Sequence, residues 1–171
     1  SPYGVAKKVV TDYLHAFRTL YGIEYTSLAL ANVYGPRQDP HGEAGVVAIF
    51  CGRLPARPEC TILGDGEQTR DFVFVGDVAD AFVRAAATPA SNGLVINIGT
   101  GVETSVNELY NAIAEAAGID APATHGEARH GEMQRSALSA ALAGEVLGWS
   151  ADTDLLTGAA ATLDWFRTKQ G

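Results

Sequence analysis

Cysteine is scarce in this sequence, which has only Cys51 and Cys60 among its 171 residues. So few cysteines exclude a small secreted scaffold that depends on several disulfides for its stability. We expect two buried or half-buried thiols, with a disulfide between them as the less favoured alternative.

Basic residues are also few, since 12 Lys and Arg stand against 20 Asp and Glu, for a formal net charge of −8. That charge argues against general nucleic-acid binding, although a few local arginines could still hold a small anion. No apolar run is long enough to span a membrane, and no signal-peptide pattern stands at the start. We therefore expect a cytoplasmic protein with neither nucleic-acid nor membrane partners.

The sequence also lacks the glycine-rich turn that opens a dinucleotide-binding half. The stretch "GTGVET" (99–104) has no third glycine and lies far down the chain. Internal repeats and low-complexity segments are absent as well. What is present is a hydrophobic fraction of 47%, enough to bury a core.

Helical and strand patterns alternate along the chain, which predicts an α/β fold. Helices are expected at 2–21, 45–54, 76–88, 105–117, 139–147 and from 152 past Trp165. Strands are expected at 24–33, 60–63, 69–75 and 93–99. The last of these is apolar enough to be buried on both faces. Ser1, Ser105 and Ser139 are the predicted helix N-caps, Ser105 as part of a capping box with Glu108.

The first helix carries Tyr3 and Lys7 four residues apart, on one face. An ammonium near a phenol favours the phenolate and lowers its pKa from the usual ~10. Such a pair can pass a proton to or from a hydroxyl group while hydride moves elsewhere. Taken alone, this spacing more often marks an exposed tyrosine beside an ordinary helical lysine.

Further motifs follow that pair in order: "TSLALANVYGPRQ", "GDGEQTRDFVFVGDVADAF", "VINIGTG", "RHGE" and "LGW". In this order the chain resembles the extended short-chain dehydrogenase/reductases, and among them the NAD-dependent epimerases and dehydratases of nucleotide sugars. The resemblance covers nearly all 171 residues. It implies the C-terminal half of such an enzyme, with the dinucleotide-binding half preceding Ser1.

The resemblance implies a division of the chain. Residues 1–35 would end the dinucleotide-binding domain, and 36–171 would form mainly the substrate-binding domain, with 93–104 returning to the Rossmann sheet. A homodimer through the helix of Tyr3 and Lys7 is also implied. Because the glycine-rich turn is lacking, we expect the isolated chain to bind NAD poorly and to be inactive.

The implied activity is the interconversion of UDP-glucose and UDP-galactose through a 4-keto intermediate, with bound NAD. One alternative is a nucleotide-sugar 4,6-dehydratase, or another nucleotide-sugar epimerase of the same family. An alternative of another class is a non-catalytic fragment that binds nucleotide sugars.

Residue roles follow from the resemblance alone. Tyr3 would be the catalytic acid and base, and Lys7 would hold the nicotinamide ribose and lower the pKa of Tyr3. Both would contact NAD, as would Leu30. The residues implied in substrate binding are Asn32, Arg70 and Arg129 at the phosphates, Val46 and Leu63 at the uracil, and Glu132 at the ribose hydroxyls. No metal site is expected, because the spacing of His125 and His130 matches no zinc signature.

A structural explanation stays open for most of these residues. Asn32 could close a turn, Arg70 could form a surface pair with Asp71, and Leu63 could belong to the core. Arg129 and Glu132 could be solvated loop charges. The chain also departs from the family pattern at three positions: Ala29 replaces a common arginine, Leu30 a frequent aromatic residue, and Ser139 a usual aspartate.

Overall fold

The computed structural model describes residues 2–41, 45–54 and 60–170, with the backbone alone at 169 and 170. Its helices are α1 (Pro2–Tyr21), α2 (Val46–Arg53), α3 (Val75–Ala87), α4 (Val106–Ala117), α5 (Ala141–Leu147) and α6 (Leu155–Gln170), with a 3-10 turn, η1 (Pro89–Ser91). The predicted cap at Ser1 lies outside the described residues. In this part of the chain no helix has the length and apolarity to cross a membrane.

The strands are short: β1 (Ser27–Leu30), β2 (Asn32–Tyr34), β3 (Thr61–Leu63), β4 (Thr69–Arg70), β5 (Phe72–Phe74), β6 (Val95–Ile98), β7 (Thr104–Ser105) and β8 (Thr124–Gly126). Within the described ranges they pair as β1–β6, β2–β5 and β3–β8, all parallel, and as antiparallel β4–β7. Because strands and helices alternate along the chain, the α/β prediction is confirmed.

Two predicted strands are each divided in the structure. The strand expected at 24–33 changes partner at Ala31, whose N–H still bonds the Ile98 carbonyl, whereas the Asn32 N–H bonds the carbonyl of Asp71. The strand expected at 69–75 is divided at Asp71, between β4 and β5. Sequence periodicity does not reveal such a change, because both halves keep extended backbone.

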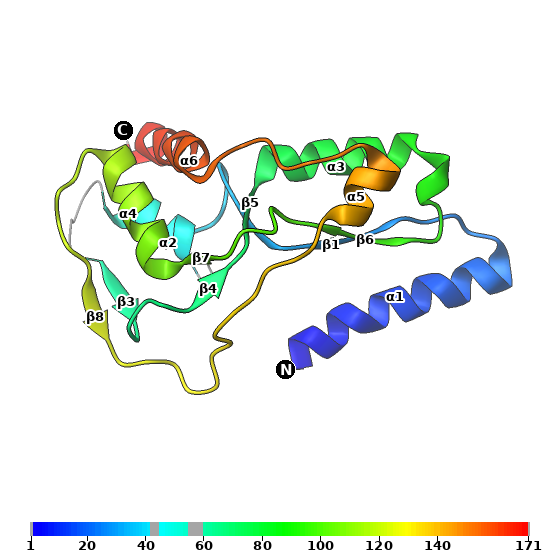
Figure 1. The fold of residues 1–171 in the computed structure, drawn as a ribbon, viewed down its shortest axis with the longest axis horizontal. Coiled ribbons are helices and arrows are strands. Elements are labelled where there is room, and N and C mark those ends of the chain that lie inside the picture. Colours follow the sequence, from blue (N-terminus) through cyan, green and yellow to red (C-terminus); the bar gives the residue numbers. More distant parts are fainter. Residues whose placement is uncertain (1, 42–44, 55–59, 171) are drawn as a thin grey trace.

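The core has two parts (Figure 1). In the first, α2, α4 and α6 pack together around residues such as Phe50, Leu109 and Leu163. In the second, α3 and α5 cover β6 and bury Ile96 and Ile98. The cavity described below is lined by Phe50 of the first part and by Asn32, the first residue of β2, which follows β1 in the chain.

Strand β6 is buried on one face rather than on both. Ile96 and Ile98 are fully buried, but Val95 between the sheet and α1 is 42% exposed. Helix α1 lies apart from the sheet in Figure 1, and no side chain along Pro2–Tyr21, all of it described, is buried. Helix α1 therefore does not bury the second face of β6, and the prediction that this strand is buried on both faces is wrong.

Of the predicted helix caps, the one at Ser105 is correct and the one at Ser139 is wrong. Ser105 and Glu108 form the predicted capping box, and α4 ends at Gly118 in the left-handed conformation. Ser139 does not cap α5, which starts after Ala140 without a side-chain cap. Helix α6 begins later than expected, after Asp154, whose carboxylate accepts the N–H and hydroxyl of Thr157.

Both cysteines are buried and free, so the alternative of a disulfide is wrong. Burial raises the pKa of the Cys51 thiol to about 12 and also raises that of Cys60. At neutral pH such thiols stay protonated and behave as small core residues.

Candidate functional site

One cavity, of about 280 Å³, brings together every residue predicted to bind substrate. These are Asn32, Val46, Leu63, Arg70, Arg129 and Glu132. Apolar side chains of the first core part complete its walls, namely Ile49, Phe50, Ile62, Phe72 and Val106. The cavity thus has an apolar slot with charged and amide groups converging on it, as small-molecule sites usually do. We call it the substrate cavity.

Separate elements deliver these side chains to the cavity. Asn32 begins β2, Val46 begins α2, and Leu63 and Arg70 end β3 and β4. Arg129 and Glu132 come from the segment 127–140, which has neither helix nor strand and which we call the connecting segment. No single periodicity links these positions, so only the fold brings them together.

Contacts within the chain hold the Arg70 side chain at several points. Its Nη1 donates to the carbonyls of Thr69 and Met133, each at 2.7 Å. Its Nη2 lies 3.4 Å from Glu132 Oε1, with 19% and 25% of the two side chains exposed. The guanidinium is therefore oriented at the cavity wall, with its charge partner drawn from the connecting segment.

The proposed surface pair between Arg70 and Asp71 does not form. Asp71 is 1% exposed, and its carboxylate bonds Thr100, Gly101 and Leu138. Successive residues of an extended strand point to opposite sides, so Arg70 reaches the cavity while Asp71 points inward. That alternative for Arg70 is wrong.

A second ion pair fastens the connecting segment beside the cavity. Arg135 donates two hydrogen bonds to Glu103, at 2.9 and 2.7 Å, and the Thr69 hydroxyl donates a third at 2.6 Å. These donors hold the pKa of Glu103 down at about 2, Arg135 contributing most. A backbone hydrogen bond from the Thr69 N–H to the Gln134 carbonyl also joins the connecting segment to β4.

The predicted cofactor contacts lie at another opening, between α1 and the sheet. Tyr3, Lys7 and Leu30 line this groove of about 640 Å³, together with β1 residues and Val95. Lys7 Nζ lies 5.3 Å from the centroid of the Tyr3 ring, and Tyr3 is 68% exposed. The pair thus meets on one helix face, as its spacing predicts.

The groove and the substrate cavity adjoin where β1 passes into β2. Leu30 and Ala31 line the groove, and Asn32 lines the cavity. This position is at the carboxyl ends of the parallel strands β1 and β6. In open α/β sheets, ligands bind at that edge.

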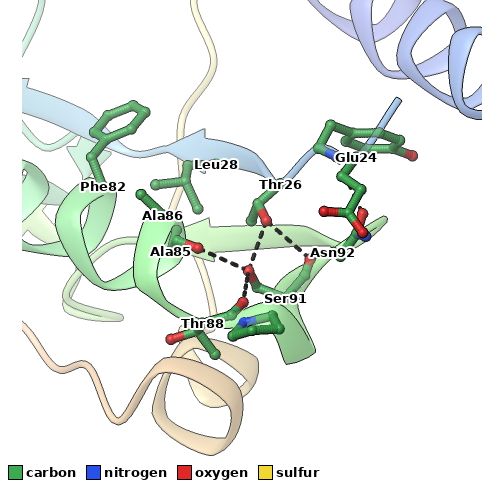
Figure 2. A pocket seen from close by; sticks show the side chains of 11 residues that line it. Glu24, Thr26, Leu28, Phe82, Ala85, Ala86, Thr88, Ser91 and Asn92 are labelled. Atoms are coloured by element: carbon green, nitrogen blue, oxygen red, sulfur yellow. Dashed lines mark hydrogen bonds between the residues drawn. The ribbon is translucent and has the colours of Figure 1, made fainter. Parts of the chain in front are cut away.

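Figure 2 shows a further pocket, at the opposite ends of these strands, beside α3. The hydroxyl groups of Thr26 and Ser91 lie 2.7 Å apart, and Ser91 also donates to the carbonyls of Ala85 and Thr88. Because these polar groups bond one another, we interpret the network as an anchor between η1, α3 and β1.

Gln68 belongs to the site, but the sequence analysis did not identify it. Gln68 is 7% exposed, lines the substrate cavity, and donates from Nε2 to the Leu63 carbonyl at 3.0 Å. The alternation of side chains along a strand could have identified Gln68. It lies two residues before Arg70 in an extended stretch, so both side chains point to the same side.

Metal binding finds no support in the described ranges, which contain no group of three or more His, Cys, Asp or Glu suited to hold an ion. His125 instead places Nδ1 2.9 Å from the Gly64 carbonyl.

Comparisons with known proteins agree with this architecture. The family model described as "NAD dependent epimerase/dehydratase family" matches residues 1–99. A UDP-glucose 4-epimerase of Mycolicibacterium smegmatis is 52% identical over 99% of this chain and 54% of its own length. The chain therefore spans about half the length of this curated relative.

Two solved structures are similar over the same extent. The crystal structure of a UDP-glucose 4-epimerase from Thermotoga maritima, with UDP-glucose, matches with a TM-score of 0.94 and 44% identity, covering 100% of this chain and 55% of that one. The Thermus thermophilus UDP-glucose 4-epimerase, in complex with NAD, matches with a TM-score of 0.86 and 40% identity over 98% and 54% of the two chains.

Proposed function

The chain belongs to the NAD dependent epimerase/dehydratase family, and we propose that it forms the substrate-binding, C-terminal part of a UDP-glucose 4-epimerase. In this proposal residues 1–35 end the dinucleotide-binding domain and 36–171 form mainly the substrate-binding domain. The segment 93–104 returns to the Rossmann sheet. Relatives named for this activity are similar over nearly the whole chain.

The observation that carries the proposal is the composition of the substrate cavity. Arg70 offers a planar fork of N–H donors suited to a diphosphate, with Arg129 as a second cation and Asn32 as an amide donor. Glu132 can accept hydrogen bonds from ribose hydroxyls, and Val46 and Leu63 border an apolar slot that fits a flat base. An anionic nucleotide is thus recognised locally despite the net charge of −8.

The chemistry would occur in the adjoining groove. Tyr3 takes the proton of the sugar 4-hydroxyl and later returns it. Lys7 lies beside it, with Nζ 5.3 Å from the centroid of the Tyr3 ring. Bound NAD would supply the hydride acceptor for carbon 4, with Tyr3, Lys7 and Leu30 beside it. This fit is partial, because these residues provide contacts for the nicotinamide ribose but no pyrophosphate cradle.

Epimerisation further requires that the 4-keto sugar turn over without leaving. Anchoring the diphosphate at Asn32 and Arg70, next to the groove, keeps the sugar in place while its exposed face changes. The anchor therefore matters to the reaction as much as the proton-transfer pair.

The test uses a polypeptide in which this chain follows a dinucleotide-binding half, incubated with UDP-glucose and monitored by proton NMR, first without and then with added NAD. We expect UDP-galactose, and a turnover lowered about 100-fold or more by Tyr3→Phe. Tyr13→Phe is the matched control, because Tyr13 is similarly exposed (62% against 68%) on the same helix.

Other outcomes contradict specific parts of the proposal. A 4-keto-6-deoxy sugar would assign a dehydratase, and unchanged UDP-glucose would leave only the fold and the cavity. Equal losses in both tyrosine variants would remove Tyr3 from the reaction. The 171-residue chain alone is expected to show neither turnover nor tight NAD binding, and tight binding would refute the need for a separate pyrophosphate cradle.

A further inference from the structure

Asp71 is a buried carboxylate to which the proposed reaction gives no role. It lies at the junction of β4 and β5, directly after Arg70, and is 1% exposed. A buried charge is costly unless hydrogen bonds compensate it. Its partners therefore indicate what its position contributes.

Four donors surround this carboxylate. Oδ1 accepts from the backbone N–H and the hydroxyl of Thr100, at 2.9 and 2.7 Å. Oδ2 accepts from the backbone N–H groups of Gly101 and Leu138, at 3.0 and 3.1 Å. Hydrogen bonds to an ionised acceptor are among the strongest in proteins. All four donors come from segments distant in sequence.

These partners belong to two segments that border the site. Thr100 and Gly101 follow β6 at the carboxyl edge of the sheet, and Leu138 belongs to the connecting segment that carries Arg129 and Glu132. The approach is close, because a Cβ at Gly99 would lie 2.5 Å from Asp71 Oδ2. Glycine at 99 thus permits this contact.

The backbone of Asp71 directly joins two of the three residues proposed to bind the phosphates, Asn32 and Arg70. Its carbonyl accepts the N–H of Asn32 at 2.8 Å, and Arg70 is its covalent neighbour. When the carboxylate is held by Thr100, Gly101 and Leu138, the peptide units that carry Asn32 and Arg70 are held with it. The two ligands come from different strands but share this one anchor.

We propose that Asp71 is a positioning residue for the phosphate end of the substrate cavity, setting the mutual placement of Asn32 and Arg70. It touches no ligand itself and acts through the backbone and the four donors. The inference rests on the proposed nucleotide site. A role in stability alone would leave the relative affinity for different ligands unchanged, which provides the test.

The test measures binding of UDP and of uridine to the 171-residue chain by saturation-transfer NMR and calorimetry, with thermal melts of each variant. Asp71→Asn presents an amide N–H₂ to N–H donors, and we expect UDP affinity to fall about 10-fold or more. Uridine affinity should change less than about twofold, because its contacts do not depend on the phosphate ligands.

Asp77→Asn is the matched control. The Asp77 carboxylate also accepts two hydrogen bonds, from the N–H and hydroxyl of Thr153 at 3.1 and 3.0 Å. Unlike Asp71, it has no sequence neighbour that lines the substrate cavity, and its partner Thr153 does not line it either. This variant should melt at a lower temperature and bind both ligands as the unchanged chain does. An equal loss of UDP affinity in Asp77→Asn would refute a specific role for Asp71.

If Asp71→Asn does not fold, two less disruptive variants at Thr100 test the same inference. Thr100→Val removes one donor to Oδ1, and Thr100→Ser keeps it. We expect about threefold weaker UDP binding for valine and full recovery for serine. Unchanged UDP affinity in Thr100→Val, or in a folded Asp71→Asn, would overturn this inference alone. Absence of UDP binding by the unchanged chain would overturn the proposed function as well.

Discussion

At the scale of single residues, Arg70 is a charged side chain whose orientation is fixed by contacts within the chain. Two backbone carbonyls and Glu132 already fix its guanidinium, which limits the rotamer entropy that binding must remove. These same contacts need the geometry of arginine. A lysine could reach one partner at a time but not the whole set.

We predict that Arg70→Lys weakens UDP binding about 10-fold, because a single ammonium cannot replace the oriented fork. Calorimetric titration of UDP into the chain checks this. The control is Arg84→Lys on α3, where the arginine pairs with Asp80 away from the cavity. Equal affinities for Arg70→Lys and the unchanged chain would mean that Arg70 does not contact the diphosphate.

At the scale of elements, the start of α4 combines local and distant functions. Ser105 caps the helix and also pairs with Thr69 between β7 and β4, while the next residue, Val106, lines the substrate cavity. A local signal in the sequence therefore stabilises an element that supports the wall of the site. Helix α5 lacks such a cap. Its residues Ala143 and Leu147 are instead buried in the second part of the core.

We predict that Ser105→Ala lowers the free energy of unfolding by about 1 kcal/mol, because it removes the oxygen that accepts the Glu108 N–H. Chemical denaturation monitored by circular dichroism measures this change. Ser139→Ala should be close to neutral, since α5 has no side-chain cap. A comparable loss at Ser139 would contradict the helix start observed here.

At the scale of the whole molecule, α1 presents many large apolar side chains to solvent. Large apolar side chains along the helix are open to solvent, among them Tyr13 at 62%, Phe17 at 44% and Leu20 at 71%. They recur at helical spacing, which in a globular protein marks a face that packs against another surface. We propose that a second copy of this helix covers it in a homodimer.

We predict a dimer by multi-angle light scattering, because burying this face removes apolar area from water. Phe17→Glu should shift the population to monomers, since the dimer would then bury a charge. Leu156→Glu on α6 is the control, with a leucine of similar exposure (41%) outside α1. A monomer at high protein concentration, or equal effects of both variants, would exclude the dimer through α1.

Local patterns in the sequence were sufficient for much of this molecule. The α/β class, the helix of Tyr3 and Lys7, the capping box at Ser105 and the left-handed Gly118 follow from short-range periodicity and backbone preference. Through the family resemblance, the ordered motifs also identified six of the residues that line the substrate cavity. Their roles in binding are still predictions.

Only the tertiary structure decided the features that depend on partners distant in sequence. The breaks at Ala31 and Asp71, the burial of β6 on one face and the pairing of Arg70 with Glu132 instead of Asp71 all belong here. The physical reason is the same in each case. Periodicity specifies whether backbone is extended or helical, but the neighbour that completes each hydrogen bond is chosen by packing across the whole chain.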